Sequence, residues 1–168
     1  MKLSIPIEDL KIARGFCASD LSRPPLNYIQ VTVGSNENEK ILLVATDSFR
    51  LCKVATDVKG DGLNPYQELY IPMLEAERAV KQARLEKSLI AFVEAVPDVK
   101  FPKWYGIIPS TSDVDSSTCS SCKFSADLLS DTLKLLKGKN VTVSMTGERK
   151  PTVITGGNVY AIIMPVSS

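Results

Sequence analysis

The stretch V-A-T-D-S-F-R-L at residues 44–51 joins two segments that read as β-strands. I-L-L-V leads into it at residues 41–44, and L-C-K-V-A leads out of it at residues 51–55. A hairpin between two strands needs only a short turn such as Asn-Gly or Asp-Gly. This join carries a threonine, an aspartate, an aromatic residue and an arginine, a mixture that is better suited to recognition than to turning.

The chain on either side repeats one order of elements, in which a helix is followed by strands. The helices are predicted from apolar residues at helical spacing, such as Ile7, Leu10, Ala13 and Cys17, and the strands from alternating polarity. The predicted helices cover residues 7–18, 73–87 and 126–137, and the predicted strands cover residues 2–5, 28–33, 41–45, 51–58, 66–71, 89–96, 141–145, 152–155 and 159–165.

Capping residues mark the ends of these helices. Pro6 and Pro72 are suited to a helix start, Ser125 is a good N-cap, and Gly138 fits the C-cap of the third helix. The residues predicted to face inward in the third helix are Leu129, Leu133 and Leu136.

Composition and charge indicate a globular protein without a general attraction to polyanions. The 168 residues are 44% hydrophobic and 23% charged, and the net charge is +1, so binding to nucleic acid or to a membrane needs locally sorted charge. No apolar run approaches the length of a membrane span, and the opening M-K-L-S-I-P is too short and polar for a signal peptide. We therefore expect a cytoplasmic protein with no membrane partner.

The sequence lacks histidine and the common catalytic motifs. There is no histidine, which excludes a histidine-based triad and removes the commonest general base. No phosphate-binding loop, dinucleotide fingerprint or nucleophile elbow occurs, and the carboxylates are scattered. We expect a protein that is not an enzyme and has no cofactor.

The four cysteines do not predict a metal site. Cys17 and Cys52 lie in apolar segments and are predicted to be buried hydrophobic residues. Cys119 and Cys122 form one C-x-x-C pair, which is two ligands short of a zinc site. We expect reduced thiols and no metal; the alternative, a metal or thiol protein, would show bound zinc by elemental analysis.

The predicted helices carry basic side chains on their exposed faces. This pattern has two interpretations: an ordinary solvated helix surface, or a layer of helices that faces DNA phosphates without reading bases. The candidate DNA-facing residues are Lys11, Arg14, Arg78, Lys81, Arg84, Lys87, Lys134 and Lys137.

Four stretches resemble one family, in the same order along the chain. V-A-T-D-S-F-R-L is similar to the A-T-D-G-H-R-L segment of the bacterial β sliding clamps, the processivity rings of DNA polymerase III. R-P-P-L-N at residues 23–27 resembles the segment before the second strand of that family, and K-F-P-K-W-Y-G-I-I-P at residues 100–109 resembles its K-F-P-D-Y-x-x-V-I-P stretch. V-Y-A-I-I-M-P-V at residues 159–166 resembles its Y-V-V-M-P-M ending.

The resemblance implies an α+β DNA-clamp fold built from repeated β-α-β-β-β units, with helices on one face of antiparallel sheets. The expected parts are a first unit at 1–66, a shortened second unit at 67–109, a serine-rich linker or loop at 110–122 and a final unit at 123–168. Units 1–66 and 123–168 could together form one compact clamp domain.

In that family the four stretches converge on a hydrophobic groove for short linear peptides of polymerases, clamp loaders and repair proteins. Carried over by position, the groove consists of Leu26, Thr46, Ser48, Phe49, Arg50, Leu51, Pro102, Ile107, Ile162, Met164 and Val166. Without the resemblance, Leu51, Ile162 and Met164 would be read as core strand residues.

Two functions follow from the resemblance. One is a processivity or scaffold protein for DNA replication and repair, which binds such peptides and, as a homo-oligomer, double-stranded DNA without sequence specificity. The alternative is a monomeric clamp mimic that binds the peptides without encircling DNA. Three positions depart from the family pattern: Ser48 replaces glycine and would be strained at positive φ, Phe49 replaces histidine, and Gly106 stands where arginine is common.

Overall fold

The computed structural model describes residues 1–34, 40–109, 123–145, 147 and 150–166. The predicted linker at 110–122, with Cys119 and Cys122, lies outside the described residues. In chain order the elements are β1 (Lys2–Pro6), α1 (Ile7–Arg14), the 3₁₀-helix η1 (Pro24–Leu26), β2 (Tyr28–Thr32), β3 (Ile41–Thr46), β4 (Arg50–Thr56), β5 (Glu68–Pro72), α2 (Met73–Leu85), β6 (Ile90–Glu94), the 3₁₀-helix η2 (Tyr105–Ile107), α4 (Ala126–Leu135), β7 (Thr142–Met145), β8 (Thr152–Gly156) and β9 (Val159–Ile163).

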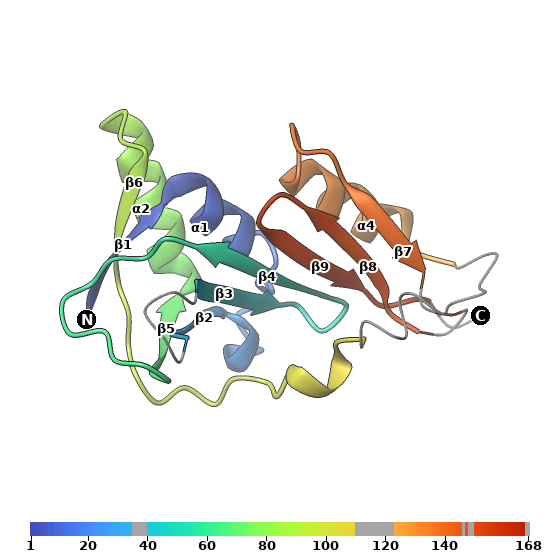
Figure 1. The fold of residues 1–168 in the computed structure, drawn as a ribbon, viewed down its shortest axis with the longest axis horizontal. Coiled ribbons are helices and arrows are strands. Elements are labelled where there is room, and N and C mark those ends of the chain that lie inside the picture. Colours follow the sequence, from blue (N-terminus) through green and yellow to red (C-terminus); the bar gives the residue numbers. More distant parts are fainter. Residues whose placement is uncertain (35–39, 110–122, 146, 148–149, 167–168) are drawn as a thin grey trace.

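Seven of the strands form one antiparallel sheet in the order β5-β2-β3-β4-β9-β8-β7, and β1 pairs with β6 in a second sheet. Figure 1 shows α1, α2 and α4 on one side of the large sheet, while the segment that follows β6 crosses its other side. This arrangement confirms the predicted α+β fold with helices on one face of antiparallel sheets.

Alternation along the strands gives the large sheet two apolar faces. The face under the helices belongs to the main core and includes Leu43, Ala45, Cys52, Val54, Ala161 and Ile163. The opposite face carries a smaller core, made of Val44, Leu51, Val153 and Ile162 together with Trp104. Trp104 comes from the crossing segment, so that segment is held to the sheet by a buried aromatic side chain.

The helices end earlier than predicted. The helix predicted to reach residue 18 ends at Arg14, and Leu136 rather than Gly138 is the C-cap of α4. The N-cap at Ser125 is confirmed, because its side chain accepts a hydrogen bond from the Leu128 nitrogen. Pro6 and Pro72 end β1 and β5 in extended conformation and act as N-caps, because each strand runs directly into its helix.

The inward face of α4 differs from the prediction. Leu136 is buried as expected, but Leu133 is 38% exposed, and Thr132 is buried in its place. The Thr132 hydroxyl donates to the Leu128 carbonyl at 2.8 Å, so its polar group is satisfied within the helix and the side chain can face the core.

Residues 1–66 and 123–168, which are predicted as the first and final units, contact each other at several points. β4 pairs with β9, and the Asn158 amide beside this pair donates to Asp9 of α1 at 2.9 Å and accepts from the Lys139 ammonium at 3.1 Å. Gly15, at the end of α1, lies so close to α4 that a Cβ there would come within 2.5 Å of the Leu135 side chain. A larger residue at position 15 would therefore require the Leu135 side chain to move.

The two described cysteines have the predicted role. Cys17 and Cys52 are buried free thiols; burial raises the pKa of Cys17 to about 12 and also raises the pKa of Cys52. Both thiols are protonated and unreactive near neutral pH. The described residues contain no group of three histidine, cysteine or acidic side chains that could hold a metal ion. None of the described helices is long and apolar enough to cross a membrane.

Candidate functional site

The β3–β4 turn is built around the carboxylate of Asp47. This carboxylate accepts hydrogen bonds from the backbone nitrogens of Phe49 and Arg50 at 2.9 and 2.8 Å, and from Nε and Nη2 of Arg50 at 2.9 and 2.8 Å. The Thr46 hydroxyl donates to the Arg50 carbonyl at 2.7 Å and accepts from the Ser48 nitrogen at 3.2 Å. Three of the polar side chains in this stretch therefore hold the turn itself.

Ser48 has a φ of +82°, the left-handed region that favours glycine. The strain expected from replacing the family's glycine by serine is therefore present. Phe49 follows Ser48 and is 55% exposed, so the turn presents a large aromatic ring to solvent. The turn is thus strained at one residue and apolar at the next.

The sheet places three of the candidate groove residues in one row. Thr46 of β3 pairs with Leu51 of β4, and Leu51 pairs with Ile162 of β9. Residues paired across strands project from the same face, so the row lies on the face opposite the helices. Thr46 is buried, and Leu51 and Ile162 are each 1% exposed.

Trp104 covers part of this row. Its indole nitrogen donates to the Gln30 side-chain oxygen at 2.7 Å, and its ring packs in the small core with Leu51 and Ile162. Pro102, which precedes Trp104 in the sequence, is half-buried. Ile107, which follows Trp104 and lies in η2, is 43% exposed. The sequence showed the family stretch that contains Trp104, but not that this tryptophan packs on Leu51.

Exposed apolar residues lie beside the row. The Met164 nitrogen donates to the Phe49 carbonyl at 2.9 Å, which joins the β3–β4 turn to the segment after β9. Met164 is half-buried, and Val166 is 48% exposed. We call the set Thr46, Phe49, Leu51, Pro102, Ile107, Ile162, Met164 and Val166 the groove residues.

Two other candidates are placed differently. Arg50 precedes Leu51 in the same strand and therefore projects from the helix face. Its guanidinium lies 5.2 Å from the centre of the Phe16 ring and forms an ion pair with Asp47 at 2.8 Å. The Arg50 side chain therefore makes its contacts inside the protein. Leu26, in η1, is buried and belongs to neither described core cluster.

The candidate DNA-facing residues are mostly paired with acids. Arg14 and Lys81 both bind Glu77, at 2.7 and 3.2 Å. Further pairs join Lys11 to Glu8, Arg78 to Glu75 and Lys134 to Asp131, whereas Arg84, Lys87 and Lys137 form no ion pair with a described residue. The described helices α1, α2 and α4 together carry six basic and six acidic side chains. The helix layer is therefore close to neutral.

An aromatic cluster next to the row was missed by the sequence analysis. The Lys53 ammonium lies 4.4 Å from the centre of the Tyr160 ring and 6.0 Å from that of Trp104. Burial lowers the pKa of Lys53 and raises that of Tyr160. The register of β4 against β9 was needed to find this cluster, because it places Lys53 opposite Tyr160.

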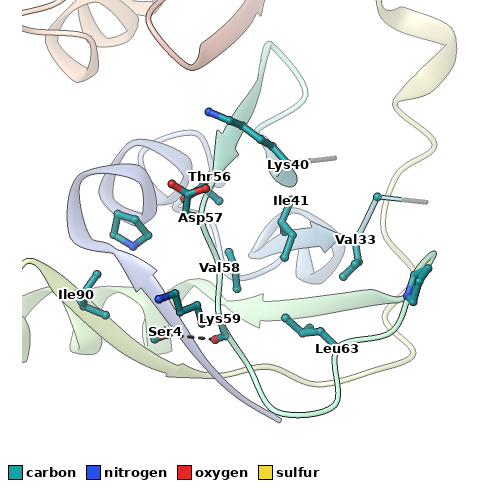
Figure 2. A pocket seen from close by; sticks show the side chains of 13 residues that line it. Ser4, Val33, Lys40, Ile41, Thr56, Asp57, Val58, Lys59, Leu63 and Ile90 are labelled. Carbon is teal, nitrogen blue, oxygen red and sulfur yellow. Dashed lines mark hydrogen bonds between the residues drawn. The ribbon is translucent and has the colours of Figure 1, made fainter. Parts of the chain in front are cut away.

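Figure 2 shows a second concave site, an open pocket of about 950 Å³. Val33, Ile41, Val58 and Leu63 give it apolar walls, and Lys59 lies at its lower edge, where its carbonyl accepts from the Ser4 hydroxyl. Val58 belongs to the main core, and Ile41 and Leu63 pack against it, so this pocket lies on the helix side of the sheet, away from the groove residues.

Solved structures with a similar fold are bacterial sliding clamps. The chain matches the DNA polymerase sliding clamp of Bacillus subtilis with a TM-score of 0.67 and 17% identity, over 100% of this chain and 64% of that one. It matches the polymerase III β subunit of Caulobacter crescentus with a TM-score of 0.72 and 15% identity, over 99% of this chain and 66% of that one. The chain has the fold of the bacterial β sliding clamps.

A third sliding clamp, from Bartonella birtlesii and bound to griselimycin, matches with a TM-score of 0.70 and 16% identity over 99% of this chain and 66% of that one. No family model and no curated protein matches the sequence. The chain spans about two thirds of the length of these clamps, 64% to 66% in the three cases. The likeness to the clamps is thus one of fold.

Proposed function

We propose that this protein is a non-enzymatic, clamp-fold scaffold that binds short linear peptides of DNA polymerases, clamp loaders or repair proteins along the groove residues. The observation that carries the proposal is the pairing of β4 with β9. This pairing sets Leu51 beside Ile162 and the Phe49 turn beside Met164, although the two segments are distant in the sequence.

The chemistry of the groove residues suits an apolar peptide side chain. Phe49, Ile107 and Val166 are large exposed apolar residues, and contiguous exposed apolar surface marks binding sites in soluble proteins. Met164 adds a flexible thioether that can adapt to different ligands. The Bartonella birtlesii clamp bound to griselimycin supports the view that this fold accommodates a ligand.

The test is a fluorescence anisotropy titration with a labelled clamp-binding peptide. We expect a Kd on the order of micromolar, about −8 kcal/mol. Phe49→Ala should weaken binding about tenfold, because it removes an exposed aromatic contact. The matched control is Phe92→Ala on β6, since Phe92 is 71% exposed and lies outside the groove residues.

Two outcomes would contradict the proposal. One is the absence of binding by the native protein; the other is an equal loss of affinity in the Phe49 and Phe92 variants. Leu51→Ala is unsuitable as a test, because Leu51 is fully buried and its truncation would cost about 2–5 kcal/mol of folding stability.

A second candidate function is a ring of several copies around DNA. It is favoured by exposed apolar residues on α4 and the edge strand β7, namely Leu133 and Val143, and around β6, namely Leu89 and Phe92. Such surfaces can join copies head to tail into a closed assembly. The neutral helix layer argues against it, since DNA encirclement without base contacts depends on basic side chains.

A further inference from the structure

Lys53 lies in β4 next to the buried row of Leu51 and Ile162, which we call the groove floor. It follows Leu51 by two residues in β4, so both side chains project from the same face about 7 Å apart. Its cross-strand neighbours are Val44 on β3 and Tyr160 on β9. Lys53 is therefore the charged side chain of β4 that follows Leu51 on the face that carries the groove residues.

The ammonium of Lys53 lies against two aromatic rings and has no counter-ion among the described residues. It lies over the Tyr160 ring at 4.4 Å and near the Trp104 ring at 6.0 Å, and it forms no ion pair with any described residue. Burial of the side chain lowers its pKa, and no acid among the described residues offsets this effect. Ring faces stabilise a cation only in part, so a half-buried ammonium retains a need for a negative partner.

The rings also fix where that partner could lie. Tyr160 faces Lys53 across the strand pair, and Trp104 is tied to Gln30 by its indole nitrogen. Both rings restrict the flexible side chain of Lys53. Less conformational entropy is therefore lost when its ammonium binds a carboxylate. Most exposed lysines, in contrast, gain little from an ion pair.

We propose that Lys53 determines the specificity of the groove by selecting peptides with an acidic residue two positions from their apolar anchor. This inference rests on the proposed peptide-binding function. In an extended peptide, side chains two positions apart lie on the same side at about 7 Å, the same spacing as Leu51 and Lys53. A peptide that runs parallel to β4 with its anchor at the level of Leu51 therefore has its acidic side chain at the level of Lys53.

The experiment compares acidic and neutral forms of one peptide. The probes are short fluorescein-labelled peptides with a central leucine–phenylalanine pair in a glycine–serine background. Each has glutamate or glutamine, placed either two residues before the leucine or two residues after the phenylalanine. In one of these placements the native protein should bind the glutamate peptide about tenfold more tightly, a difference of about 1.4 kcal/mol.

Variants locate the source of the preference. Lys53→Met keeps a long apolar side chain against the rings and should bind both peptides equally, whereas Lys53→Glu should prefer glutamine. Lys103→Met is the matched control, because Lys103 is an exposed lysine of the crossing segment, and it should keep the native preference. Thermal unfolding of each variant, followed by circular dichroism, verifies that it is folded.

The outcomes separate this inference from the function on which it rests. Equal binding of glutamate and glutamine peptides by the native protein overturns the role of Lys53 and leaves the groove intact. A preference that survives in a folded Lys53→Met variant overturns it as well. If the native protein binds none of the peptides, the proposed function itself fails. The comparison on the native protein requires no variant to fold.

Discussion

Ser48 stores conformational strain in the β3–β4 turn, because its φ of +82° is unfavourable for a residue with a Cβ. We expect Ser48→Gly to stabilise the protein by about 0.5–1 kcal/mol, the relief of about 1–2 kcal/mol of strain less the larger entropy that glycine loses on folding. Urea denaturation measures the change. Ser130→Gly, at an exposed position inside α4, should instead destabilise by about 0.5 kcal/mol, and a loss of stability in both variants would contradict this account.

At the same scale, Arg50 shows what the sequence could and could not reveal. The resemblance puts both Arg50 and its strand neighbour Leu51 in the groove, although two adjacent strand residues must face opposite sides of a sheet. The position of Arg50 on the helix face was therefore predictable from alternation. Its partners were not, because the ring of Phe16 comes from a segment whose approach depends on how α1 packs.

Among the secondary-structure elements, α1 and α2 are joined by Glu77, which binds Arg14 of α1 and Lys81 of its own helix. Hydrogen bonds from these two cations hold the pKa of Glu77 below its ordinary value of 4.5. A carboxylate with a lowered folded-state pKa stabilises the protein above its unfolded-state pKa, and this contribution is lost as the pH falls through the folded value.

We therefore expect Glu77→Gln to lower the urea midpoint at pH 7 and to match the native protein once the pH is well below 4.5. Glu94→Gln on β6 is the control, since Glu94 is exposed and makes no ion pair with a described residue. A difference that persists unchanged in acid would mean that Glu77 acts through packing and not through its charge.

The order of elements was largely predictable, because helical spacing and alternation are local properties of the sequence. The errors lie where packing decides. In α4, Leu133 is exposed and Thr132 is buried, with its hydroxyl satisfied within the helix. The packing of Trp104 on Leu51 depends on the path of a long connection. The contact of Lys53 with Tyr160 depends on strand register. Sequence periodicity encodes neither of these.

At the level of the whole molecule, charge distinguishes the two candidate functions. With six basic and six acidic side chains on its helices, the protein should bind DNA weakly, because affinity for the phosphate backbone grows with the number of released counter-ions. We expect a monomer in analytical ultracentrifugation and no retention on circular DNA near physiological salt. A closed oligomer that stays on circular DNA and leaves it on linearisation would establish the ring instead.

Trp104, which packs on the groove floor, gives the protein a useful fluorescence signal. Trp104 is the only tryptophan in the chain, it is buried in the small core, and a lysine ammonium lies 6.0 Å from its ring. Its fluorescence therefore comes from a single place beside the groove residues. Any ligand that displaces water there or draws Lys53 away from the indole will change the emission, so the protein carries its own label-free reporter of occupancy.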